Sequence, residues 1–154
     1  MNLLVVDDDS VVRMSMRTLL TSEGHSVCTA ADGEDALAKL ASHTFDMIIS
    51  DVYMPNMDGV RLRNVVREIP DKRSLPFLFI SGYDDQSTID MIRNPKLEGF
   101  FKKGRPLSEL LSWITYLTTP EHKRSTFPPT LTRDLASDQQ HGRVQRGSSR
   151  VPLL

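Results

Sequence analysis

The sequence predicts an α/β fold in which a doubly wound, five-stranded parallel sheet is covered by helices on both sides. Short apolar runs alternate along the chain with segments whose apolar residues recur at helical spacing. Runs that are apolar at nearly every position belong to strands buried on both faces, which is typical of parallel sheets between helix layers. The length of 154 residues and the hydrophobic content of 39% suit one core.

Five apolar runs are the candidate strands. They cover residues 3–6, 25–30, 45–50, 75–80 and 99–101. The second run contains Cys28, the single cysteine of the chain, which cannot form an intramolecular disulfide and is expected to be a small buried residue.

Helical periodicity follows each candidate strand. Ser10 is the expected N-cap of the first helix and Gly24 its end, while Pro70 and Pro120 stop the third and fifth helices. A fourth, weaker helix is expected between residues 84 and 95. The other apolar faces consist of Val12, Met16, Leu19 and Leu20, of Ala36, Leu37, Leu40 and Ala41, of Leu62, Val65, Val66 and Ile69, and of Leu107, Leu110, Leu111, Ile114 and Leu117.

Carboxylates stand at the ends of two of these strands. The first strand runs into Asp7, Asp8 and Asp9, and the third runs into Asp51. If the two strands are neighbours in a parallel sheet, their carboxyl ends form one acidic pocket. Oxygen ligands select a hard cation, and a few carboxylates with water suit Mg²⁺. The competing interpretation is that these acids are solvated turn residues, as the turn signal Asp58-Gly59 would suggest.

A hydroxyl and a lysine follow the last two strands. Ser81 ends the fourth strand, and Lys102 and Lys103 end the fifth. A metal ion, an ammonium group and a hydroxyl together can hold a phosphoryl group, because the cations neutralise its charge and the hydroxyl donates a hydrogen bond. Ser81 could instead cap the helix that follows it.

The motifs at these strand ends resemble the receiver domain of two-component response regulators. The segments that carry the resemblance are 5–10 (VVDDDS), 51–59 (DVYMPNMDG), 80–82 (ISG) and 99–103 (GFFKK). They occur in the family's order, and the likeness covers residues 1 to about 119. It implies a flavodoxin-like receiver fold with strand order 2-1-3-4-5, which brings the first and third strands to the topological switch point.

The resemblance implies that Asp51 accepts a phosphoryl group from a sensor histidine kinase, a phosphotransfer protein or a small acyl phosphate. Mg²⁺ would be the cofactor, held by Asp8, Asp51, the backbone carbonyl of Tyr53, and Asp7 either directly or through water. Such a domain is not an enzyme beyond its own phosphotransfer and autodephosphorylation. Tyr53 and Tyr83 would flank the route of water to the phosphoryl group.

By the same resemblance, Ser81 and Lys103 contact the phosphoryl group and Phe100 is the aromatic residue of the switch. The spacing after Ser81 favours Lys103 over Lys102. Where the family has a Lys-Pro peptide, this chain has Lys103-Gly104, which leaves the geometry of that turn open. A downstream protein would bind the face formed by the fourth helix, the fifth strand and the fifth helix, which bears Met91, Ile92, Lys102, Arg105 and Trp113.

Two other functions are considered. The first motif also resembles haloacid-dehalogenase-type phosphatases, with Asp7 as nucleophile and Asp9 as general acid, but that reading leaves residues 51–59 unexplained. The third hypothesis is a receiver-like adaptor that works without phosphorylation. Mapping the phosphorylated residue would separate the three functions. A receiver would be phosphorylated on Asp51, a phosphatase on Asp7, and an adaptor on neither.

Charge divides the chain into a body and a tail. Residues 1–119 carry 13 Lys and Arg against 17 Asp and Glu, whereas residues 120–154 carry 6 against 3. The body is the predicted receiver domain, and the tail, interrupted by Pro and Gly, is predicted to be disordered, with a short helix at 131–139 as an alternative. We expect no DNA-binding domain, no membrane segment and no cleavable leader, and therefore a cytoplasmic protein.

Overall fold

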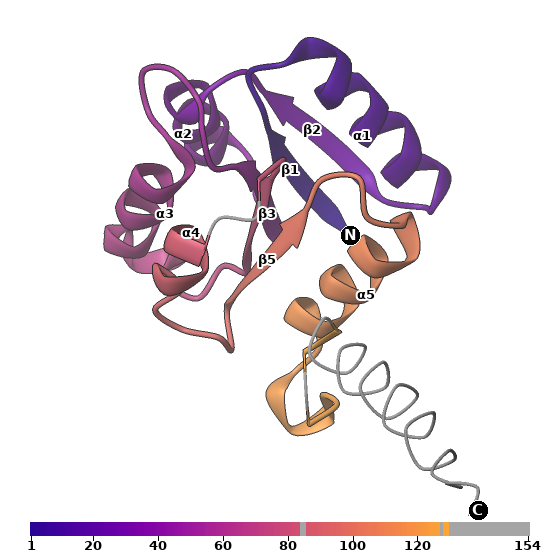
Figure 1. The fold of residues 1–154 in the computed structure, drawn as a ribbon. Helices are drawn as coiled ribbons and strands as arrows, with labels where there is room; N and C mark the ends of the chain where they lie inside the picture. Colours follow the sequence, from indigo (N-terminus) through magenta and orange to yellow (C-terminus); the bar gives the residue numbers. More distant parts are fainter. Residues whose placement is uncertain (84–85, 127, 130–154) are drawn as a thin grey trace, which may run out of the picture.

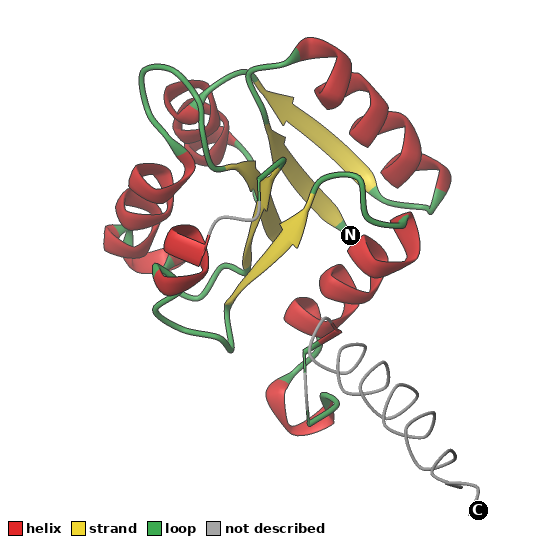
Figure 2. Cartoon of the chain, in the orientation of Figure 1, coloured by secondary structure: helices red, strands yellow, loops and turns green. Residues whose placement is uncertain are grey.

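The structure is a computed structural model that describes residues 1–83, 86–126 and 128–129. Strands and helices alternate along the chain (Figures 1 and 2). The strands are β1 (Asn2–Val6), β2 (Ser26–Ala30), β3 (Met47–Asp51), β4 (Phe77–Ser81) and β5 (Glu98–Lys102). The helices are α1 (Ser10–Ser22), α2 (Gly33–Ser42), α3 (Gly59–Glu68), α4 (Gln86–Asp90) and α5 (Leu107–Thr118), with 3-10 turns η1 (Pro70–Lys72) and η2 (Glu121–Lys123).

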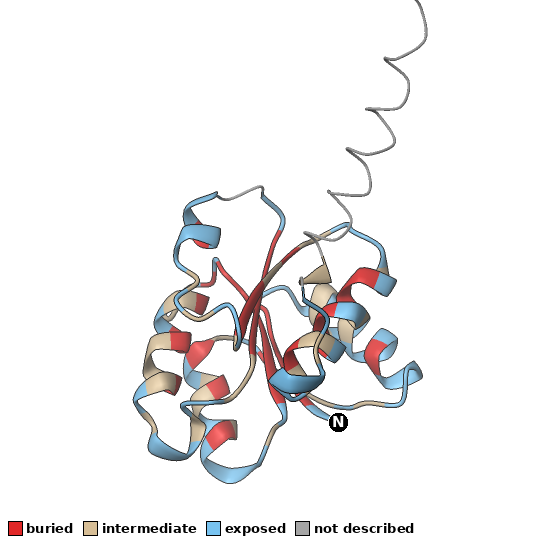
Figure 3. Ribbon diagram, turned by 90° about the horizontal axis from the view of Figure 1, so that it is seen from below, coloured by how far each residue is buried: buried red, intermediate tan, exposed pale blue. Residues whose placement is uncertain are grey.

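All strand pairs are parallel and the order is β2-β1-β3-β4-β5, which confirms the predicted fold class and topology. Helices α1 and α5 lie on one side of the sheet and α2, α3 and α4 on the other (Figure 1). Alternate residues of each strand pack into two apolar cores, one on each side of the sheet. Val5 and Ile49 belong to the α1–α5 core, and Val6 and Ile48 belong to the α2–α3 core. Figure 3 shows the buried positions gathered in the strands and the inward helix faces.

Short polar side chains begin the first three helices. The N-cap of α1 is Asp9, whose carboxylate accepts hydrogen bonds from the Val11 and Val12 N–H groups, so the expected cap at Ser10 is wrong by one residue. Asp32 and Asp58 cap α2 and α3 in the same way. The predicted stop of α1 is confirmed, because Gly24 follows its C-cap with a φ of 86°.

The expected fourth helix is confirmed: α4 is a short segment of five residues inside the predicted interval. The position of the single tryptophan differs from the expectation. Trp113 is only 6% exposed, and an added Cβ on Gly99 would lie 2.5 Å from its ring. Trp113 therefore belongs to the core between α5 and β5, and its assignment to a docking face is wrong. Cys28 is half-buried against the α2–α3 core.

A buried ionic network joins α3 to the start of β5. The Arg63 side chain is 1% exposed, and its Nη1 lies 2.5 Å from Oε2 of Glu98. Arg67 Nε lies 3.2 Å from the other Glu98 oxygen, and the Arg93 N–H donates to Oε2 at 3.0 Å. We call Arg63, Arg67 and Glu98 the arginine network. Both oxygens of this buried carboxylate are satisfied within the fold.

The first residues after α5 contact the body of the domain. Arg124 donates hydrogen bonds to the carbonyls of Leu117, Thr119 and Lys96, and its guanidinium lies 5.3 Å from the centre of the Tyr116 ring. The tail predicted to be disordered begins at residue 120, and the structure gives its residues 121–123 the 3-10 turn η2. The alternative helix at 131–139 lies outside the described residues. Among the described helices, none has the length and apolar character needed to cross a membrane.

Candidate functional site

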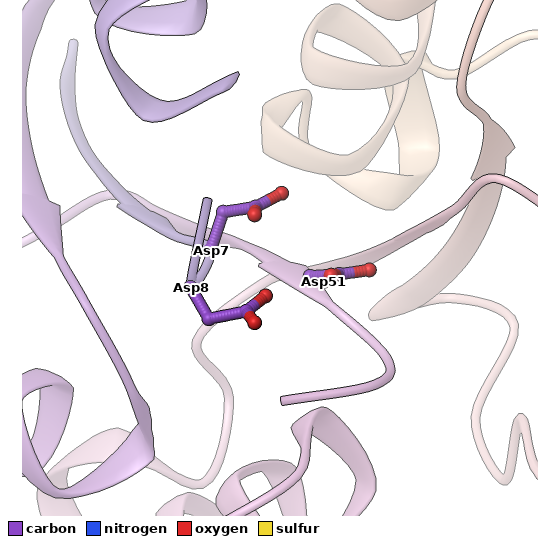
Figure 4. A group of neighbouring side chains, drawn as sticks. All are labelled: Asp7, Asp8 and Asp51. Carbon is purple, nitrogen blue, oxygen red and sulfur yellow. The ribbon is translucent and has the colours of Figure 1, made fainter. Parts of the chain in front are cut away.

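Three carboxylates meet at the C-terminal edge of the sheet. Asp7 and Asp8 directly follow β1, and Asp51 is the last residue of the neighbouring strand β3. One oxygen of each carboxylate lies within 4.8 Å of the other two, and Figure 4 shows the three side chains together. Asp7 is fully buried, Asp51 is 7% exposed and Asp8 is exposed. We call these residues the carboxylate cluster.

Local hydrogen bonds fix the end of β1. One oxygen of Asp7 accepts the Asp9 N–H at 2.9 Å. Arg13, one turn into α1, donates from Nη1 to the carbonyls of Asp7 and Asp8 at 2.7 and 3.1 Å. These bonds hold the chain reversal between β1 and α1, so that Asp8 presents its carboxylate at the surface beside buried Asp7.

Close backbone packing fixes Asp51. Its Oδ1 accepts the N–H of Val52 at 2.9 Å, and an ideal Cβ on Gly59 would lie only 2.3 Å from the Asp51 carbonyl oxygen. No side chain fits at that separation, so position 59 must be glycine for α3 to begin this close to β3. The Asp58-Gly59 pair thus serves the site and is more than a surface turn.

Lys103 extends from the end of β5 into the cluster. Its Nζ lies 2.8 Å from Oδ2 of Asp7 and 3.3 Å from Oδ2 of Asp51. Burial acts to lower the pKa of Lys103, but the hydrogen bond to Asp7 and the charges of both aspartates leave that pKa above its ordinary value. The Lys103–Gly104 peptide is trans, and Gly104 turns the chain with a φ of 87°.

The pKa of the Asp51 carboxyl is shifted mainly because the residue is buried. Burial raises the pKa of the Asp51 carboxyl above its ordinary value; the Lys103 ammonium opposes that shift and the Asp7 carboxylate adds to it. An additional cation at the cluster would favour the ionised, nucleophilic form of Asp51.

The remaining predicted residues lie around this cluster. Ser81 is fully buried at the end of β4; its Oγ accepts the Tyr83 N–H at 3.2 Å, and its carbonyl accepts the Lys103 N–H at 2.7 Å. Phe100 is half-buried against the α2–α3 core. Tyr53 and Tyr83 are exposed, and their rings form an edge-to-face pair with centres 6.3 Å apart.

The donor set fits Mg²⁺. Within the described residues, the cluster offers oxygen ligands alone, with an exposed side at Asp8 where water and a phosphoryl oxygen could complete the coordination. Arg13 and Gly59 shape this site and were missed by sequence reasoning. The Asp58-Gly59 signal could have pointed to Gly59, whereas Arg13 carries no local signal because its partners are backbone carbonyls.

A family model described as "Response regulator receiver domain" matches residues 3–115. That interval spans most of the chain and ends inside α5. The chain belongs to the receiver-domain family of response regulators. This confirms the resemblance seen in the motifs, and the haloacid-dehalogenase reading is wrong. Asp9, its supposed acid, is committed to capping α1.

Related response regulators match almost the whole of this chain. "Response regulator MprA" of Mycobacterium avium is 35% identical over 156 residues, 99% of this chain and 67% of that protein. MprA of Mycolicibacterium vanbaalenii is 33% identical, with 98% and 66% covered. The chain thus spans about two thirds of the length of these relatives.

Solved structures show the same fold. The Vibrio cholerae chemotaxis protein CheY4 aligns with a TM-score of 0.70 and 31% identity, over 75% of this receiver chain and 97% of that chain. The Thermotoga maritima response regulator TrrA, solved in complex with Mg²⁺-BeF, aligns with a TM-score of 0.64 and 27% identity, over 75% and 97%.

Proposed function

We propose that this receiver acts in a cytoplasmic response regulator and accepts a phosphoryl group on Asp51 in a Mg²⁺-dependent reaction. The donor would be a sensor histidine kinase or a phosphotransfer protein, and the output a contact with another protein. The observation that carries the proposal is the carboxylate cluster, where a buried aspartate lies beside two acids and a lysine. The Mg²⁺-BeF complex of the related TrrA supports the same cofactor.

Asp51 would act as the nucleophile. One of its carboxylate oxygens attacks the phosphorus of a phosphohistidine, the P–N bond breaks, and the imidazole nitrogen keeps the electron pair and takes a proton from water. When bound, Mg²⁺ supplies charge neutralisation for the carboxylates and phosphoryl oxygens. Asp8, Asp51, the Tyr53 carbonyl and Asp7 would hold it, the last directly or through water. The chain otherwise contributes positioning.

Lys103 and Ser81 would hold the product. The Lys103 Nζ, 3.3 Å from the Asp51 carboxylate, is within reach of a phosphoryl group attached there. Ser81 Oγ now accepts the Tyr83 N–H, so donation to a phosphoryl oxygen would reorient its hydroxyl and the loop after β4. Because Lys103 N–H also binds the Ser81 carbonyl, the ends of β4 and β5 would respond together.

The response would reach the face formed by α4, β5 and α5. Phe100 on β5 would change its packing when the loop moves, and Met91, Ile92, Lys102 and Arg105 would form the surface that a target reads. Met91 is 44% exposed and Arg105 is also exposed, with its guanidinium 3.0 Å from Glu109. A phosphorylation event shifts this equilibrium only by its differential stabilisation of one state.

The test is intact-mass measurement after incubation with acetyl phosphate and Mg²⁺. Wild type should gain one phosphoryl group, which Asp51→Asn should lose entirely. Asp9→Asn is the matched control, because an asparagine still caps α1 outside the cluster, and it should be phosphorylated like wild type. Lys103→Ala should be phosphorylated but fail to change the chemical shifts of the α4–β5–α5 face.

Two other outcomes of this experiment would contradict the proposal. An adduct that persists in Asp51→Asn and maps to Asp7 would move the nucleophile. A wild-type protein that takes up no phosphoryl group, although Mg²⁺ binds, would favour the adaptor function.

A further inference from the structure

Strand β2 leaves one edge of the sheet open. It is the first strand in the order β2-β1-β3-β4-β5 and pairs with β1 alone among the described strands (Figure 1). Ser26 donates its N–H to the Met1 carbonyl, and the Ala30 carbonyl accepts from Asp7, so these residues face β1. The alternation of a parallel ladder therefore turns the backbone groups of Val27 and Thr29 outward.

The outward edge keeps most of its hydrogen-bonding capacity. Lys39 donates from Nζ to the Thr29 carbonyl. In the described part of the chain, the N–H and C=O of Val27 and the N–H of Thr29 have no recorded partner on that side. Unpaired edge groups in a row are a template for another extended chain.

A basic groove runs along this edge. Its volume is about 880 Å³, and it lies between α1 and α2 with β2 as its floor. The charged side chains that line it are Arg17, Lys39 and Lys72, joined by His43, and its lining contains no Asp or Glu. Lys39 is paired with Asp35 at 3.0 Å, whereas Arg17 and Lys72 form no ion pair with a described residue.

We propose that the open edge of β2 binds an extended acidic peptide segment of another protein, which adds to the sheet as a further strand. The backbone of such a segment would pair with Val27 and Thr29. Its side chains would alternate between the two faces, as Val27 packs toward the α1–α5 core and Cys28 toward the α2–α3 core. Acidic residues would then meet Arg17 on one face and Lys39 or Lys72 on the other.

Charge selects this occupant over two others. A second copy of the chain would bring two basic grooves together, and like charges at close range oppose pairing. The segment 120–154 of this chain carries 6 basic against 3 acidic residues, so it lacks the charge that complements the groove. The site does not use Asp51, and its binding is independent of phosphorylation.

The probe is a blocked synthetic peptide of alternating glutamate and valine, added to the isotope-labelled full chain. The amides of Val27 and Thr29 should shift and become protected from hydrogen exchange, while the protection of Ser26, already bonded to β1, should not change. The same peptide with lysine in place of glutamate is the control and should bind at least about fivefold more weakly. Equal binding of both peptides would overturn the proposal.

Two variants separate the backbone from the charges. Val27→Pro removes one outward N–H at a position where an edge strand tolerates proline, and it should weaken binding about two- to tenfold. The double variant Arg17→Gln with Lys72→Gln keeps the backbone and should weaken binding about fivefold at low salt. Arg61→Gln, on the exposed side of α3, should leave the affinity unchanged.

Three further results would overturn the proposal. Peptide binding without any change at Val27 and Thr29 would exclude strand addition. Protection of the Val27 amide that rises with protein concentration would identify a second copy as the occupant. Protection in the free full chain that disappears after deletion of residues 130–154 would identify the chain's own tail.

Discussion

Two regions of this receiver enclose charged side chains, and they differ in how the charge is balanced. In the arginine network, both oxygens of buried Glu98 have partners within the fold. In the carboxylate cluster, one oxygen of each of three acids lies within 4.8 Å of the other two, and the Lys103 ammonium pairs with two of them, Asp7 and Asp51. In the first arrangement the fold itself satisfies the buried carboxylate, whereas the second retains negative charge that a cation would balance. Uncompensated charge in a partly exposed cluster marks these carboxylates as the candidate functional site.

The largest effect should come from breaking the arginine network. Arg63→Met leaves the buried Glu98 carboxylate without its closest partner and should lower the free energy of unfolding by about 3 kcal/mol, measured by urea denaturation. Arg61→Met, an exposed arginine two positions earlier, should change it by less than about 0.5 kcal/mol. Adding Glu98→Leu to Arg63→Met should restore much of the loss. Equal costs for Arg63→Met and Arg61→Met would show that the network carries no special stability.

The next effect is steric and lies under the cluster. Gly59→Ala places a Cβ against the Asp51 carbonyl and should lower the free energy of unfolding by about 2 kcal/mol, because the approach of α3 to β3 cannot relax. Calorimetric titration should also show weaker Mg²⁺ binding. Gly82→Ala is the control: its added Cβ meets nothing within 4 Å, so both stability and Mg²⁺ affinity should stay near wild type. A Gly59→Ala variant as stable as wild type would contradict the close packing of α3 against β3.

A smaller effect is expected from removing the Asp51 charge, which tests whether the cluster carries unbalanced negative charge in the absence of metal. The raised pKa of Asp51 means that the folded state binds its proton more tightly than the unfolded state. Stability is therefore lost as pH rises from the ordinary pKa of an aspartate through the raised one. Metal-free Asp51→Asn should be more stable than wild type above this window and equal to it below. Stability is measured by thermal unfolding, and excess Mg²⁺ should reduce the stability gain of Asp51→Asn over wild type. A gain that does not depend on pH would refute the charge argument.

The smallest effect concerns the rings of Tyr53 and Tyr83, which contact each other beside the cluster. If the pair excludes water from phosphorylated Asp51, Tyr53→Asn or Tyr83→Glu should speed loss of the phosphoryl group about three- to tenfold, as expected for loss of one aromatic contact. The decay is followed by mass measurement with Mg²⁺ present. Unchanged decay in both variants would show that the rings do not shield the site.

Local patterns allowed the fold and most of the site to be predicted. Apolar runs gave the strands, and acids at two strand ends gave the cluster, because side-chain direction and strand polarity follow from the backbone alone. The errors are instructive. Ser10 and Asp9 are equally good caps by residue type, and only the turn after β1 selects Asp9. Trp113 could lie on either side of its helix until Gly99 on β5 was seen to receive its ring.

What the sequence by itself determined is the type and order of the elements and the acidic ends of β1 and β3, since these depend on residues that are neighbours along the chain. Only the tertiary structure decided that Arg63 is buried, because its partner Glu98 lies 35 residues away. The same holds for Lys103, whose ammonium meets Asp7 across 96 residues. Charged side chains enter the interior only with a partner, and that partner is supplied by the packing of distant segments.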